Sequence, residues 1–216
     1  VGYLRQADIL AQRTSVGWNI QTPNGLFRTY SATLSRDDEW DTGGLKTWGS
    51  TELDVNGQLK NKWSLYGGFR WIEAPVDTRR LRGGPALRQD AFVCTNAGFE
   101  TDTSRRLGAS LSAHGHFHQE QASLQTDLSS YTWVRPTRTL RLSANVSYSG
   151  NRDDLEYVAT AGSTATPLFV LGRISQRTWA LTLRAALSLT PDLTLQYYAN
   201  PFASTGRYGQ FKDARD

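Results

Sequence analysis

Hydrophobic and polar residues alternate with a period of two along most of this chain, most clearly between residues 178 and 202. Trp179, Leu181 and most other odd-numbered residues up to 189 are apolar, whereas polar residues occupy most of the even-numbered positions. Thr190-Pro191-Asp192 then predicts a tight turn, because proline fixes φ and aspartate can bond its own backbone. The alternation resumes over residues 193–199, so the segment is predicted to form one amphipathic β-hairpin.

The same alternation predicts strands along the rest of the chain. Apolar residues occupy every second position near residues 15–21, 30–34, 45–59, 63–71, 107–117, 124–134 and 140–148, with a less regular strand near 91–99 and a long one from about residue 169 into the hairpin. We expect about ten to twelve antiparallel strands in an up-and-down order.

The predicted connections fall into two classes that alternate along the chain. Short turns are expected at residues 22–25, 60–61, 101–104, 135–138 and 190–192. Long charged loops are expected at residues 36–44, 73–89 and 150–168 and from residue 203 onward, with residues 119–121 a short connection on the same side. This asymmetry is typical of outer-membrane barrels, whose short turns face the periplasm.

The composition favours a barrel over a water-soluble sandwich. Mean hydropathy is −0.50 and 38% of the residues are hydrophobic, yet Trp, Tyr and Phe together reach 11%. A barrel explains this combination, because it exposes apolar residues to lipid and keeps a polar lumen. No apolar run of about 18 residues exists, which excludes a transmembrane helix. We therefore predict an all-β chain in which residues 1–216 form a single antiparallel up-and-down transmembrane β-barrel domain, or part of one.

Charge and cysteine content narrow the possibilities further. The net charge is +4, but the 24 basic residues are spread along the strands rather than gathered in a stripe, so we expect no nucleic-acid partner. Cys94 is the only cysteine, which rules out a disulfide framework. The sequence has neither a methionine nor a signal peptide, so we expect a processed or excised piece of an exported protein. No cofactor is implied.

Several short motifs follow one another over almost the whole chain. They are Leu81-Arg82-Gly83-Gly84-Pro85 with Arg88, Asn151-Arg152-Asp153-Asp154 leading to Tyr157-Val158, Gln176-Arg177-Thr178, Thr190-Pro191-Asp192-Leu193, and Asn200-Pro201-Phe202 continuing to Phe211-Lys212. In these motifs the chain resembles a family of bacterial outer-membrane proteins of unassigned function. The resemblance implies a C-terminal β-barrel in the outer membrane of a Gram-negative bacterium, usually preceded by a domain like carbohydrate-binding module family 9. That sugar-binding domain is absent from this sequence, and family members continue with further strands, so the resemblance assigns no carbohydrate-binding residue here.

An arginine-rich loop is the first candidate site. Arg79, Arg80, Arg82 and Arg88 lie in the longest irregular stretch, and Gly83-Gly84-Pro85 permits a sharp inward fold. In one interpretation these arginines line a pore constriction and contact anionic groups by bidentate bonds. In the other, the loop is structural and its arginines tether it to carboxylates in the lumen.

The three histidines of the chain, His114, His116 and His118, form the second candidate site. On a strand this spacing puts all three imidazoles on one face, where neighbouring histidines can share a metal ion. They are equally well explained as residues of a polar lumen wall, because no carboxylate ligand is specified. The acid pairs Asp37-Asp38 and Asp153-Asp154 do not suggest a glycosidase, since adjacent residues point apart, and we expect no catalytic residues.

The pattern as a whole predicts an outer-membrane pore or surface protein for passage or handling of a solute, carbohydrate-derived according to the resemblance. Its main partner would be the lipid bilayer, and no particular oligomeric state is implied. A soluble or self-assembling β-sheet binding or structural protein is the alternative, with the apolar faces buried between sheets or protomers. A glycan-active enzyme is the third interpretation.

Overall fold

The computed structural model describes residues 8–119, 123–163 and 166–214. These residues form antiparallel strands joined by turns, and no helix occurs among them, which confirms the predicted all-β class. None of the described segments is a helix of the length and apolarity needed to cross a membrane.

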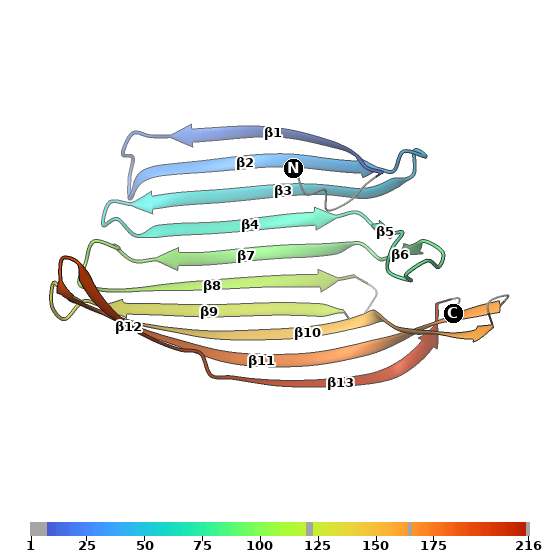
Figure 1. Ribbon diagram of the computed structural model, residues 1–216. Helices are drawn as coiled ribbons and strands as arrows, with labels where there is room; N and C mark the ends of the chain where they lie inside the picture. Colours follow the sequence, from blue (N-terminus) through green and yellow to red (C-terminus); the bar gives the residue numbers. More distant parts are fainter. Residues whose placement is uncertain (1–7, 120–122, 164–165, 215–216) are drawn as a thin grey trace.

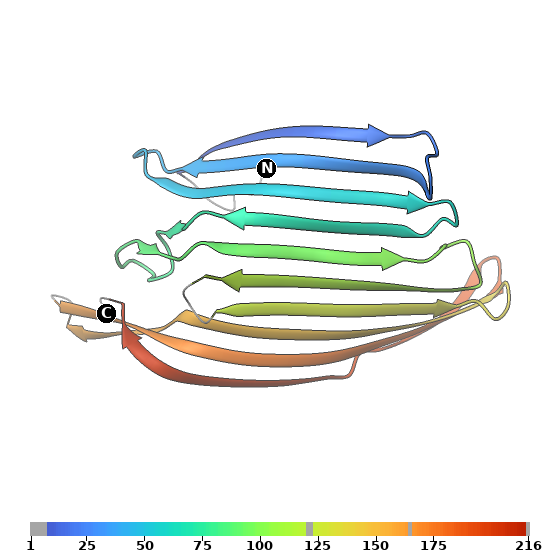
Figure 2. The same ribbon diagram turned by 180° about the vertical axis from the view of Figure 1, so that it is seen from behind.

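Eleven of the strands form one large sheet. They are β1 (Leu10–Ile20), β2 (Phe27–Trp40), β3 (Lys46–Leu59), β4 (Ser64–Ile72), β7 (Phe92–Glu100), β8 (Leu107–His118), β9 (Leu124–Val134), β10 (Leu140–Ser163), β11 (Thr166–Thr190), β12 (Leu193–Ala199) and β13 (Phe202–Asp213). The other two, β5 (Val76–Asp77) and β6 (Leu87–Arg88), pair with each other. The strands of the sheet follow one another in sequence order from β1 to β11 (Figures 1 and 2), so the predicted up-and-down arrangement is confirmed.

The sheet is open. Within the described residues β1 pairs only with β2, and the opposite edge is shared by β12 and β13, which both pair with β11. The backbone N–H of Leu181 donates to the carbonyl of Pro201 at 2.9 Å, between the two paired stretches. β12 and β13 therefore form one interrupted edge strand. Pro201 suits this edge position, because it has no N–H to offer to a further strand.

The two ends of the sheet differ in their connections. At the short-turn end, on the left of Figure 1, lie the connections 21–26, 60–63, 101–106, 135–139 and 191–192. At the loop end, on the right, lie residues 41–45 and 73–91 and the far ends of the β10–β11 hairpin, whereas most of the predicted connection at residues 119–121 lies outside the described residues. The predicted hairpin around Thr190-Pro191-Asp192 is confirmed, because Thr190 pairs with Leu193.

The strand register separates apolar from polar residues onto two faces. Residues directly opposite on neighbouring strands point to the same side of a sheet. Leu34 lies opposite Val16 on β1 and Leu53 on β3, and Leu53 lies opposite Phe69 on β4. The same face carries Trp179 on β11. We call this the apolar face and the other the polar face.

The apolar face has no second layer over it among the described residues. Phe69 and Trp179 are 49% and 56% exposed, and they are among about thirty exposed large hydrophobic side chains of the described residues, most of which lie on this face. The buried hydrophobic residues are few: Ile72, Leu81, Phe92, Trp133, Leu155 and Leu171. This is the opposite of a soluble sandwich, which buries such a face in its core.

Three of the predicted long loops are wrong. Residues 36–40 continue β2, residues 150–163 continue β10, and residues 202–213 form β13. The charged residues stay in the strands because neighbouring strands supply opposite charges; Arg173, for example, pairs with Asp154 at 2.5 Å. Only the predicted loop at 73–89 is a long connection, extending from residue 73 to residue 91.

Candidate functional site

A row of polar side chains crosses the middle of the polar face. Glu52 on β3 lies opposite Arg70 on β4 and forms an ion pair with it. Arg70 lies opposite Cys94, and Cys94 lies opposite His116, which in turn lies opposite Gln125 on β9. Five consecutive strands thus present ionisable or hydrogen-bonding groups along one line.

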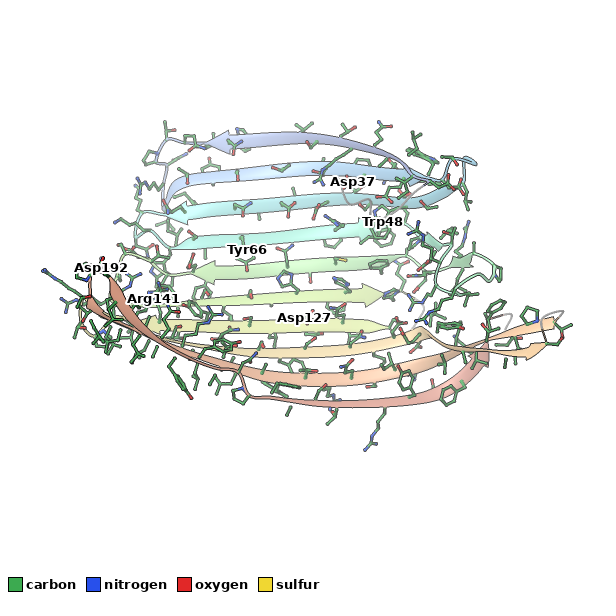
Figure 3. All side chains as sticks on the ribbon, in the orientation of Figure 1. Asp37, Trp48, Tyr66, Asp127, Arg141 and Asp192 are labelled. Atoms are coloured by element: carbon green, nitrogen blue, oxygen red, sulfur yellow. The ribbon has the colours of Figure 1, made fainter. Side chains whose placement is uncertain are left out.

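A second row runs parallel to the first. His114 lies opposite both Asn96 on β7 and Asp127 on β9. Gly68 on β4 leaves room for its neighbours, since an added Cβ would lie 2.7 Å from the Asp54 carboxylate and 2.5 Å from the Asn96 amide. Figure 3 labels Tyr66 and Asp127 in this central part of the sheet. The polar face is therefore hydrophilic along its whole middle.

The three histidines lie on the polar face, as their spacing predicts, but their surroundings differ. His118 Nδ1 lies 3.0 Å from Asp90 Oδ1, and its ring stacks on Phe92 with 4.6 Å between centroids. His114 faces Asp127, and His116 faces Cys94 and Gln125. Among the residues that the structure describes, no group of three His, Cys, Asp or Glu side chains is placed to hold a metal ion. The histidines thus act as separate members of the polar rows.

The arginine-rich loop crosses the loop end of the sheet. We call residues 73–91 the crossing loop. They leave β4 and return to β7, yet Arg80 reaches β10, where its Nε donates to the Leu155 carbonyl at 2.7 Å and its guanidinium pairs with Asp153. The loop therefore extends past β8 and β9, and Arg80 supports the tethering interpretation of the sequence.

Apolar contacts hold the crossing loop in the same place. Leu81 is 1% exposed and packs with Leu155 on β10 and Leu171 on β11. Gly84 lies against Phe169, where an added Cβ would come within 2.8 Å of the ring. The glycine is therefore required by close packing.

The other arginines of the crossing loop are placed differently. The Arg82 guanidinium carbon lies 5.0 Å above the centre of the Tyr157 ring. Arg88 is an exposed residue of β6. Arg79 is also exposed, and the loop backbone at this point is held by Asp77 Oδ1, which accepts hydrogen bonds from the N–H groups of Arg79 and Arg80.

A cavity of about 100 Å³ lies between the crossing loop and the polar face. Arg80 and Gln89 of the loop line it together with His116, Gln125 and Asn151 of the sheet. It brings together members of both predicted sites, the arginine loop and the histidine strand. The sequence did not predict this meeting, since it depends on how far the loop extends across the strands.

A larger cavity, of about 350 Å³, lies near the short-turn end and was missed by the sequence analysis. Tyr131, Ser143, Asn145, Thr182 and Arg184 line it. All five occupy polar-face positions of β9, β10 and β11. The available signal was the alternation itself, which places these polar side chains on one face.

A ring of four charges lies on the apolar face toward its loop end, beyond Leu34 on β2. Arg36 contacts Asp38 and Glu73, each with a shortest distance of 2.6 Å, and Lys46 contacts the same two carboxylates at 2.8 Å. Hydrogen bonds from Arg36 and then Lys46 lower the pKa of Asp38 to about 2 and that of Glu73 to about 2. Both carboxylates are therefore ionised at neutral pH.

Comparison with known proteins identifies a family for the chain. The profile of a family described as a domain of unknown function, DUF5916, matches residues 1–216. No curated protein and no solved structure matches the chain.

Proposed function

The chain belongs to the DUF5916 family of domains of unknown function, and we propose that it forms the wall of an outer-membrane β-barrel through which a solute passes. The observation that carries the proposal is the uncovered apolar face set against a largely polar one. Lipid against the first face and water against the second satisfy both. The resemblance to outer-membrane proteins supports the same location, a Gram-negative outer membrane.

The height of the apolar band agrees with a bilayer. On β8, apolar or small residues occupy every outward position from Leu107 to Phe117. Ten steps of about 3.3 Å give a length of about 33 Å along the strand, or about 25 Å when the strand is tilted by about 40°. On β2 the band ends at Leu34, where the charge ring at Arg36 begins. Charged groups beyond an apolar band of this height are expected at a membrane surface.

The open edges are compatible with barrel closure. The path from β1 to β12 contains ten strands in alternating direction, so β1 and the β12/β13 edge are antiparallel to each other. They can close a barrel by pairing directly or through an even number of intervening strands. In lipid, the backbone groups of both edges need such partners, because no water is available to bond them.

The polar rows and the crossing loop suggest the role of the lumen. The rows supply hydrogen-bonding groups along the path of a polar solute, and the crossing loop is fixed over one end by Arg80 and Leu81. A carbohydrate-derived solute is the class favoured by the resemblance to proteins with a carbohydrate-binding domain. The loop would then set the width of that end.

Single-channel conductance in a planar lipid bilayer tests the proposal. We expect stable conductance steps from the purified protein, and a changed step size or ion selectivity in Arg80→Ala, because this change releases the loop from β10. Arg138→Ala, in the short turn at the other end, is the matched control and should leave loop-dependent selectivity intact. Protein that inserts but never conducts would contradict passage of a solute, and protein that stays in water without detergent would favour the soluble or self-assembling alternative.

A further inference from the structure

The cavity near the short-turn end is built from one transverse row and its neighbour. Tyr131, Asn145 and Thr182 lie opposite one another on β9, β10 and β11. Ser143 and Arg184 form the next opposite pair toward the turns. The cavity of about 350 Å³ is large enough for a small organic solute, since ligand sites begin near about 300 Å³.

Two arginines flank this cavity, and each is held by a tyrosine. Arg141 Nη2 donates to the Tyr131 hydroxyl at 3.3 Å. The Arg184 guanidinium carbon lies 5.1 Å above the centre of the Tyr198 ring. Arg141 lies two residues from Ser143, the partner of Arg184, and such diagonal neighbours have Cα atoms about 7–8 Å apart. Figure 3 labels Arg141 at the short-turn end, far from Asp37 and Trp48 at the loop end.

These two arginines differ from Arg70, Arg80 and Arg173 in lacking an acidic partner. Arg70 pairs with Glu52, Arg80 with Asp153, and Arg173 with Asp154. Within the described ranges, no carboxylate forms an ion pair with Arg141 or Arg184, and none lines the cavity. The lining of the cavity thus holds one positive charge, Arg184, with hydroxyl groups and an amide, and Arg141 places a second positive charge beside the lining residue Tyr131.

We propose that this cavity binds the anionic group of a small solute, a carboxylate, phosphate or sulfate. Guanidinium groups bind such oxyanions by paired hydrogen bonds, and Ser143, Thr182 and Tyr131 supply further hydrogen-bonding hydroxyls. The tyrosines keep the two guanidiniums in place before the ligand arrives, which lowers the entropic cost of binding. This site adds an acidic class of solute to the proposed function. It rests on that function, because the solute reaches the polar face only if this face lines the lumen of a barrel.

Equilibrium binding tests the site without relying on pore activity. Purified protein in a polyoxyethylene detergent is titrated with glucuronate, with glucose and with inorganic phosphate, by calorimetry. We expect saturable binding of glucuronate and phosphate and none of glucose, since glucose lacks the charged group. Arg184→Gln and Arg141→Gln should each weaken glucuronate binding by about tenfold or more, the effect of losing a charge-assisted hydrogen bond.

Two further variants separate the site from general charge and from folding. Arg177→Gln removes a charge from β11 on the opposite face and should bind glucuronate like the unaltered protein. Arg184→Lys keeps the charge but loses the paired geometry, so it should bind with intermediate affinity. Equal binding of glucose and glucuronate, no saturable binding at all, or glutamine variants that keep full affinity while retaining strand content by circular dichroism would overturn the proposal.

The source of the anionic group is distinguished by competition. If phosphatidylglycerol displaces glucuronate and phosphatidylcholine does not, the occupant in the membrane is a lipid headgroup; if neither displaces it, the occupant is a free solute. If the protein binds glucuronate but never conducts, the passage of a solute is contradicted and the anion site is supported. Conductance without anion binding would contradict the site alone.

Discussion

At the scale of single residues, a few side chains join strands that are far apart in the sheet. Arg80 and Asp153 are 73 positions apart in the chain, and the loop that carries Arg80 joins β4 to β7, whereas Asp153 belongs to β10 beyond β8 and β9. Both side chains are partly buried, with 20% and 26% of their surface exposed. Their pairing, with the bond from Arg80 to the Leu155 carbonyl, fixes the crossing loop on β10.

Replacing Asp153 by asparagine should loosen the crossing loop without unfolding the sheet. The change removes the charge partner of Arg80, and we expect a local loss of stability of about 1.5–3 kcal/mol, because hydrogen bonds to charged groups contribute that much. Limited proteolysis should then cut between residues 73 and 91 several times faster. Arg88→Gln, an exposed change in the same loop, is the control; equal cleavage of all three proteins would contradict the tether.

At the scale of elements, the hydrophobic alternation predicted the strands well and their ends poorly. The hairpin at residues 178–202 and the common face of His114, His116 and His118 follow from a period of two. The charged end of β2 looks like a loop in the sequence, because the partners of its charges are far away in the chain. In the structure Arg36 pairs with Glu73 after β4, and Asp38 pairs with Lys46 on β3, so the strand continues. The alternation of residues along a strand determines which side chains share a face, whereas contacts with residues far away in the chain determine where the strand ends.

The candidate site was predictable to a similar extent. The sequence located the arginine loop and allowed for tethering by Arg80, but could not supply Asp153 or Leu171 as its contacts, because they depend on which strands the loop crosses. The cavity near the short-turn end was missed because its lining residues become neighbours only through the register of β9, β10 and β11. The sequence shows that these polar residues share one face of the sheet, but it does not show that they line one cavity.

The charge ring should make stability depend on acid. The folded-state pKa values of Asp38 and Glu73, both about 2, lie below the ordinary values of 3.8 and 4.5. A lowered pKa contributes stability above the ordinary value, and that stability is lost as pH falls from about 4.5 to about 2. Glu73→Gln should therefore lower the free energy of unfolding at pH 7 by less than about 1 kcal/mol, because the ring is partly exposed.

Thermal unfolding between pH 2 and pH 7 measures this effect. The dependence on pH should be weaker in Glu73→Gln than in the unaltered protein, because one of the two titrating groups is gone. Asp192→Asn, in the turn at the other end of the sheet, should retain the full dependence. An unchanged slope in Glu73→Gln would show that the ring does not stabilise the fold.

At the scale of the whole molecule, the proposed function depends on the difference between the two faces of one open sheet. Leu111 and Ser112 are adjacent on β8 and point to opposite faces, the first 45% exposed on the apolar side. Leu111→Arg should impair insertion into lipid vesicles by about 2–4 kcal/mol, the cost of a charge near the middle of a bilayer. Ser112→Arg places the same charge on the polar face and should insert normally. Equal insertion of both variants would contradict the assignment of the faces.

Spin-label accessibility along β8 is the most direct measurement of the central claim. Single cysteines are introduced from residue 109 to residue 114 in protein with Cys94→Ser, labelled, and reconstituted in lipid vesicles. If the apolar side faces lipid, labels at 109, 111 and 113 will be reached by oxygen dissolved in the bilayer, and labels at 110, 112 and 114 will be reached by a water-soluble nickel complex, in strict alternation. Nickel access at 109, 111 and 113, or protection of these positions from both reagents, would contradict a lipid-facing apolar side and indicate water or another protein surface there instead.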